Sequence, residues 1–116
     1  MKIGVPKEIK AQENRVALLP SAAYQLTKRG HQVIVEAGAG AGSGFPDVEY
    51  KGAGAEVVTS HEEIFARADM LVKVKEPLES EWPLFRPGQI LFTYLHLAAN
   101  KRLTEALMAT GMTGIA

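Results

Sequence analysis

Short apolar segments rich in β-branched residues recur along the chain, separated by more polar stretches. Most of these segments are continuously apolar. That pattern is typical of strands covered on both faces, as in a parallel sheet, whereas a strand with one wet face alternates polar and apolar positions. The pattern therefore predicts strands over residues 3–5, 32–36, 56–59, 70–74, 89–94 and 112–116.

Helical signals lie between the predicted strands. A helix is predicted over 21–29, where Pro20 precedes it and Gly30 ends it. Ser60 and Glu63 have the spacing of a capping box at the start of a second helix. Helices are predicted over 21–29, 46–51, 60–67 and 100–110, with a weaker turn over 79–84. Strands alternating with helices predict an α/β fold, a doubly wound and mainly parallel sheet with helices on both faces, Rossmann-like or flavodoxin-like.

Composition narrows the class of protein. With 116 residues, 47% of them hydrophobic, the chain is expected to form one globular domain. The net charge is zero and there is no Cys, so we expect no nucleic-acid partner, disulfide framework or thiolate chemistry. No apolar run approaches the ~20 residues that span a bilayer, and the start of the chain lacks an apolar signal segment. We therefore expect a cytoplasmic protein with no membrane partner.

A glycine-rich stretch over 38–44 follows the second predicted strand. It suggests a dinucleotide-binding loop but fails the G-x-G-x-x-G/A pattern, because Ser43 or Phe45 occupies the last position. It also follows the second strand instead of the first. We therefore expect no cofactor-binding residue here but a flexible loop with positive φ angles and close backbone approach, with a mobile lip over a neighbouring subunit or site as the alternative.

Charged residues follow three of the predicted strands at their carboxyl ends, where open α/β sheets bind ligands. Arg15 lies in the long, charged connection after the first strand. Its guanidinium suits a carboxylate or phosphate, although a solvated loop with a salt bridge from Arg15 to Glu13 or Glu8 is an open alternative.

Lys73 and Lys75 flank Val74 near the end of the fourth strand and share one strand face. A partly desolvated Lys75 at a strand end can polarise a carbonyl or pair with an anion. The alternative is an edge strand whose lysines prevent aggregation. The pattern leaves both interpretations open.

His96 lies in an apolar setting after the fifth strand, where it suits general acid and base chemistry, with a buried structural His as the alternative. His31 and His61 are expected to be structural, and the wide spacing of the three histidines predicts no metal site. Arg15, Lys75 and His96 together suit a 2-oxo acid or amino acid as substrate.

Five segments carry a family resemblance: MKIGVPKEIK, ENRVAL, GAGAGSGF, VKVKEP and LFTYLHLAA. In order and spacing they closely resemble the N-terminal region of the alanine dehydrogenase family over residues 1–116. A departure is Leu19, where the family often has Thr before the Pro, which weakens the cap of the following helix. The opening GVPKE and the RVA segment also resemble the alpha subunit of nicotinamide nucleotide transhydrogenase, whereas the FTYLHL segment favours the dehydrogenase.

The resemblance implies NAD-dependent, reversible oxidative deamination of L-alanine to pyruvate and ammonia. It implies that Arg15 and Lys75 bind the substrate, that Lys75 and His96 are catalytic, and that Tyr94 is a wall of the pocket. The NAD-binding domain would lie beyond residue 116, so residues 1–116 would be an N-terminal substrate-binding domain that is inactive alone. The parent enzyme would be a homo-hexamer. The alternatives are a domain like the transhydrogenase alpha subunit or a stand-alone 2-oxo-acid binding module.

Overall fold

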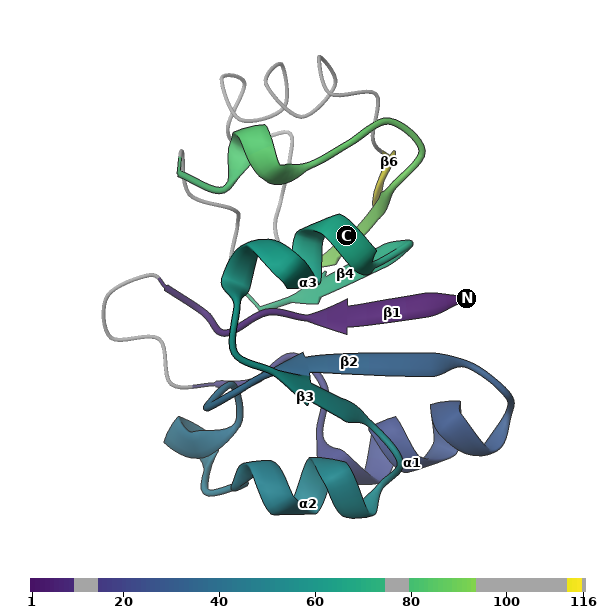
Figure 1. Ribbon diagram of the computed structural model, residues 1–116, viewed down its shortest axis with the longest axis vertical. Coiled ribbons are helices and arrows are strands. Elements are labelled where there is room, and N and C mark those ends of the chain that lie inside the picture. Colours follow the sequence, from purple (N-terminus) through teal and green to yellow (C-terminus); the bar gives the residue numbers. More distant parts are fainter. Residues whose placement is uncertain (10–14, 75–79, 94–112, 116) are drawn as a thin grey trace.

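The computed structural model describes residues 1–9, 15–74, 80–93 and 113–115. In this part of the chain six strands form one sheet in the order β3-β2-β1-β4-β5-β6, with every neighbouring pair parallel. Figure 1 shows this arrangement. All the predicted strands are confirmed to within two residues at each end: β1 (Lys2–Val5), β2 (Gln32–Glu36), β3 (Glu56–Val58), β4 (Met70–Lys73), β5 (Ile90–Thr93) and β6 (Thr113–Ile115).

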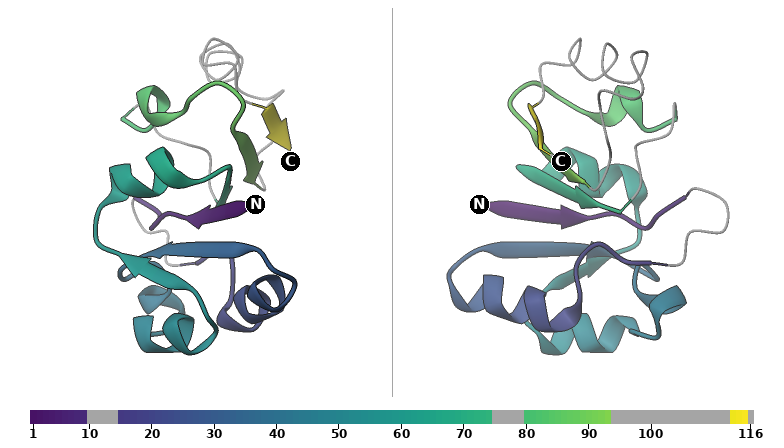
Figure 2. Two further views of the ribbon diagram at one scale, coloured as in Figure 1. Left: turned by 45° about the vertical axis from the view of Figure 1, so that its right-hand side comes forward. Right: turned by 180° about the vertical axis from the view of Figure 1, so that it is seen from behind.

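Helices cover both faces of this sheet, as the alternating pattern predicts (Figures 1 and 2). The described helices are α1 (Pro20–Lys28), α2 (Asp47–Gly52) and α3 (His61–Arg67), with single 3-10 turns η1 (Ala41–Ser43) and η2 (Trp82–Leu84). Strand β2 passes between the two layers. Ile34 packs in the core cluster under α3, whereas Val33 and Val35 pack in the cluster with residues of α1 and α2. Successive strand side chains point to opposite faces, so the two clusters lie on opposite sides of the sheet.

Local signals explain where the helices begin. The Ser60 hydroxyl accepts the Glu63 backbone N–H at 3.2 Å, so that part of the predicted capping box is confirmed. Leu19 caps α1 without a side-chain hydrogen bond, as expected for an apolar residue at this position. The predicted helix over 100–110 lies outside the described residues. No described helix has both the length and the apolar character that crossing a membrane requires.

The glycine-rich loop has the expected backbone. Gly38 and Gly44 have positive φ angles of 82° and 84°. At Gly40 a Cβ atom would lie only 2.7 Å from the ring of Tyr50, so close approach requires glycine there. The buried Tyr50 donates its hydroxyl to the Leu18 carbonyl at 2.7 Å and so joins α2 to the segment before α1. Burial, followed by the nearby carboxylates, raises the pKa of Tyr50 to about 12, so it stays a donor at neutral pH.

Candidate functional site

The strand order reverses between β1 and β4. From β1 the chain proceeds outward to β2 and β3, then crosses back over the sheet to β4 on the other side of β1. In open parallel sheets, ligands bind beyond the carboxyl ends of the two strands that flank such a switch point. The site is therefore expected where β1 ends at Val5 and β4 ends at Lys73.

Arg15 is the one sequence-predicted site residue within the described part, and its side chain is exposed in the connection after β1. Lys75, Tyr94 and His96 lie outside the described residues. The structure does describe the strands from which they follow. Lys73 of β4 pairs in register with Thr93 of β5, so the two strands end side by side. In the sequence, Lys75 follows the end of β4 by two residues and His96 follows the end of β5 by three.

A group of charged side chains lies at this edge of the sheet and is called the carboxyl-edge cluster here. Its members come from the ends of β2 and β4, the starts of α3 and η2, and the connection after β1: Glu8, Glu36, His61, Lys73 and Glu81. The Lys73 ammonium lies 3.3 Å from the Glu8 carboxylate and 3.4 Å from that of Glu81. Its side chain is 1% exposed, and charges this deeply buried persist only when paired.

The edge-strand alternative for the lysines is wrong for Lys73. Its strand β4 pairs with β1 on one side and β5 on the other, so it is an interior strand. A lysine that prevents aggregation would project into solvent from an outer strand. Lys73 instead occupies a buried site between two carboxylates.

His61 joins the cluster from the first turn of α3. Its Nδ1 lies 2.5 Å from Glu36 and its Nε2 lies 2.8 Å from Glu81. Hydrogen bonds to Glu36 and then to Glu81 raise the pKa of His61 to about 9, so the ring is a cation at neutral pH. The expected structural role of His61 therefore needs refinement, because this ring connects two buried carboxylates at the ligand-binding edge. One feature of the sequence could have indicated this role. His61 begins the helix that follows β3, and in a parallel sheet a helix that follows a strand begins at the carboxyl ends of the strands.

The described residues do not fit the pyrophosphate of a dinucleotide. The turn after β1 reads Pro6, Lys7, Glu8 and has no glycine, and the Glu8 carboxylate lies there as a negative charge. In the glycine-rich loop, the Gly38 N–H is already bonded to the Asp47 carboxylate at 2.8 Å. Among the described residues, no group of three or more His, Asp and Glu side chains is arranged to hold a metal.

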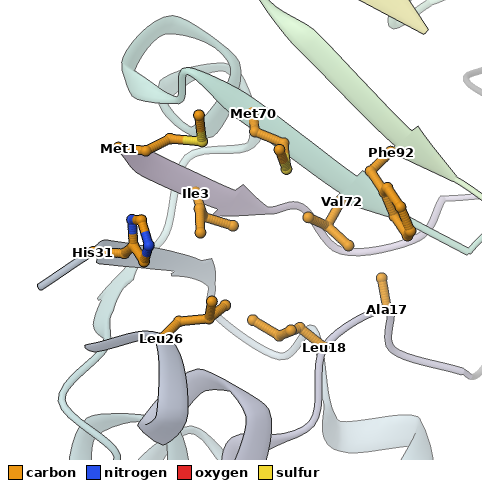
Figure 3. Close-up of a pocket in the computed structure, with 9 residues that line it drawn as sticks. All are labelled: Met1, Ile3, Ala17, Leu18, Leu26, His31, Met70, Val72 and Phe92. Carbon is orange, nitrogen blue, oxygen red and sulfur yellow. The ribbon is translucent and has the colours of Figure 1, made fainter. Parts of the chain in front are cut away.

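A pocket, called the apolar pocket here, lies on the α1 side of the sheet (Figure 3). Its volume is about 510 Å³, and its walls come from β1, β4, β5, the segment before α1, and α1 itself. The lining residues are Met1, Ile3, Ala17, Leu18, Leu26, His31, Met70, Val72 and Phe92. Among the described residues that line it there is no Asp, Glu, Lys or Arg side chain to recognise a substrate anion. His31 contributes a buried Nδ1 that lacks a hydrogen-bond partner within the described structure.

Comparison with known proteins now adds to this geometry. The family model described as "Alanine dehydrogenase/PNT, N-terminal domain" matches residues 4–116. The chain belongs to this family. It is 53% identical to alanine dehydrogenase from Mycolicibacterium smegmatis and 55% identical to that from Methanococcus maripaludis, in each case over the whole chain. It spans 31% of the length of these relatives.

Solved structures agree with this membership. An L-alanine dehydrogenase superposes on the whole chain with a TM-score of 0.96 at 55% identity, and the chain covers 32% of it. A transhydrogenase from Sinorhizobium meliloti gives a TM-score of 0.92 at 34% identity, with 34% of that protein covered. The α/β fold predicted from the strand and helix pattern is thus confirmed within the family that the sequence resembles.

Proposed function

We propose that residues 1–116 form the N-terminal substrate-binding domain of an NAD-dependent L-alanine dehydrogenase. The proposed reaction converts L-alanine, water and NAD⁺ reversibly to pyruvate, ammonium, NADH and a proton. The observation that carries the proposal is the likeness to alanine dehydrogenases over the whole chain at 55% identity, against 34% for the transhydrogenase structure. The difference favours the dehydrogenase over the transhydrogenase alternative.

The proposed roles follow from the chemistry of each side chain. Arg15 binds the substrate carboxylate through its guanidinium fork. In the direction of pyruvate amination, Lys75 donates a hydrogen bond to the carbonyl oxygen of pyruvate. It stabilises the negative charge that develops on this oxygen as ammonia adds and the carbinolamine forms. In the direction of alanine deamination, His96 accepts a proton from the water that adds to the imine carbon. It returns this proton to the nitrogen, which leaves as ammonia. Tyr94 is a wall of the pocket. The paired ends of β4 and β5 support this placement of Lys75 and His96.

The cofactor is proposed to bind outside this chain. The described residues do not fit a pyrophosphate, and the chain spans about a third of its relatives. NAD would accept the hydride in the complete enzyme, which we propose is a cytoplasmic homo-hexamer. The isolated 116-residue chain is expected to show no turnover.

A chimeric enzyme tests the proposal. Residues 1–116 replace the matching N-terminal segment of the Mycolicibacterium smegmatis enzyme, which is 53% identical. The chimera is expected to oxidise NADH with pyruvate and ammonia as cosubstrates. A folded chimera that shows no such oxidation would refute the proposed function.

Two variants of the chimera test the roles. His96→Ala is expected to lower kcat by about 10²–10⁴-fold, the usual contribution of a positioned acid or base, with a smaller change in KM. Arg15→Ala is expected mainly to raise the KM for pyruvate, because it removes a carboxylate contact. Near-normal kinetics in both variants would contradict the site assignment.

A further inference from the structure

Two carboxylates of the carboxyl-edge cluster also accept hydrogen bonds from backbone N–H groups. At one end, the Glu36 carboxylate accepts the Lys7 backbone N–H at 2.8 Å. At the other end, the Glu8 carboxylate accepts the Val74 backbone N–H at 3.1 Å. Lys7 and Val74 follow the last residues of β1 and β4, the two strands that flank the switch point. The cluster thus fixes where the chain leaves both strands.

The two backbone contacts are joined through an unbroken series of ionic contacts. From Glu36 the series passes to His61 at 2.5 Å and then to Glu81 at 2.8 Å. It continues from Glu81 to Lys73 at 3.4 Å and from Lys73 to Glu8 at 3.3 Å. Negative and positive groups alternate along it, with Glu81 and Lys73 each 1% exposed. Displacing one member therefore removes an ionic partner from its buried neighbours, which disfavours local rearrangement.

We propose that the carboxyl-edge cluster is a positioning network for Lys75, an inference that rests on the proposed function for the role of Lys75 itself. Val74 is the residue directly before Lys75. The Val74 N–H belongs to the peptide bond between Lys73 and Val74, so its contact with Glu8 holds the backbone directly before Lys75 in the sequence. Lys73 in turn holds the Glu8 carboxylate in place. Lys73, Glu8 and His61 act through Lys75 as positioning residues and do not touch the substrate.

The test uses Lys73→Met in the chimeric enzyme, since Met fills similar volume without the charge. The expected result is a fall of about ten- to hundredfold in kcat/KM for pyruvate, because a misplacement of ~1 Å at a site has effects of this size. The KM for NADH is expected to stay unchanged. Lys28→Met is the matched control, because it makes the same chemical change at an exposed residue of α1. A Lys73→Met enzyme that is folded and has unchanged kcat/KM for pyruvate would overturn the inference.

A pair of Glu8 variants separates positioning from simple loss of stability. Glu8→Gln keeps the shape and an oxygen that can accept the Val74 N–H, whereas Glu8→Ala removes the acceptor. Glu8→Gln is therefore expected to retain more of the pyruvate kcat/KM than Glu8→Ala, at a temperature where both are folded. Equal losses in both variants would overturn the role of the Val74 contact. This pair also decides the question if Lys73→Met does not fold.

Hydrogen exchange gives a readout that does not depend on catalysis. Mass spectrometry of the peptide that contains Val74 is expected to show faster exchange in Glu8→Ala than in the parent chimera, with Lys28→Met unchanged. Unchanged exchange in Glu8→Ala refutes the network. An inactive parent chimera refutes the proposed function alone, and the exchange result then still decides whether the cluster holds Val74.

Discussion

The carboxyl-edge cluster and the apolar pocket both include residues of the central strands of one sheet, yet a histidine has opposite surroundings in the two regions. In the cluster, both ring nitrogens of His61 meet carboxylates, at 2.5 and 2.8 Å. In the apolar pocket, the buried Nδ1 of His31 has no partner among the described residues. His31 lies before β2, at the amino ends of the strands, whereas His61 follows β3 at their carboxyl ends.

This difference shows how a parallel sheet places polar groups at the carboxyl ends of its strands and apolar groups on its covered faces. All strands point the same way, so every connection that follows a strand brings its polar residues to the same edge. The cluster draws charges from β2, β4, α3 and the connection after β1 in this way. The apolar pocket is instead lined by strand side chains on the face of the sheet that α1 covers, and these side chains are apolar. Variants in the two regions should therefore change the free energy of unfolding by different amounts and in different directions.

The largest expected effect comes from Lys73→Ala. This change removes one cation and leaves Glu8 and Glu81 as buried carboxylates without it. The free energy of unfolding is expected to fall by about 3–5 kcal/mol, the usual cost of breaking a buried ion pair from one side. Urea unfolding of the 116-residue chain measures it.

A double-variant cycle provides the control for Lys73. If the loss comes from the broken ion pair between Lys73 and Glu8, Glu8→Gln added to Lys73→Ala should cost much less than Glu8→Gln alone, because the two residues are in contact. Additive losses would show that Lys73 acts independently of Glu8.

The next effect in size comes from His61→Gln and depends on pH. The pKa of His61 rises from 6.5 to about 9 in the folded chain. A raised pKa means that the protonated form favours folding. This contribution is fully present below pH 6.5 and is lost as the pH rises through about 9. His61→Gln should therefore destabilise the chain by about 1–3 kcal/mol at pH 6, and by much less at pH 10.

The check is the difference in unfolding free energy between the parent chain and His61→Gln, measured across this pH range. The difference removes the contributions of groups that both chains share. Arg67→Gln is a suitable control from the same helix, because its ion pairs with Glu56 and Glu63 involve partly exposed side chains. It is expected to change the unfolding free energy far less than His61→Gln does at pH 6, because exposed ion pairs contribute little to stability. A His61 difference that stays constant with pH would contradict the ionic role of this ring.

The same contrast explains what the sequence predicts and what it does not. Strands such as Gln32–Glu36 are predictable because burial on both faces imposes a continuous apolar run. The position of Lys73 near the end of a strand is predictable from the sequence pattern, but the strand order that makes this end part of the switch point is known only from the structure. The partners of Lys73 are not, because Glu8 and Glu81 approach it from distant segments through tertiary packing. No local pattern records such contacts.

The smallest expected effect, and the one that separates the two regions most sharply, comes from His31→Leu. Because the buried Nδ1 lacks a partner among the described residues, replacing the ring with an apolar side chain breaks no hydrogen bond of this atom to them and adds apolar contact in the pocket. The unfolding free energy should stay unchanged or rise by up to ~1 kcal/mol. His31→Asn, which keeps a polar atom near the ring nitrogen, should give no such gain. A loss above ~1 kcal/mol in His31→Leu would show that His31 is bonded as His61 is, and the contrast between the two histidines would fail.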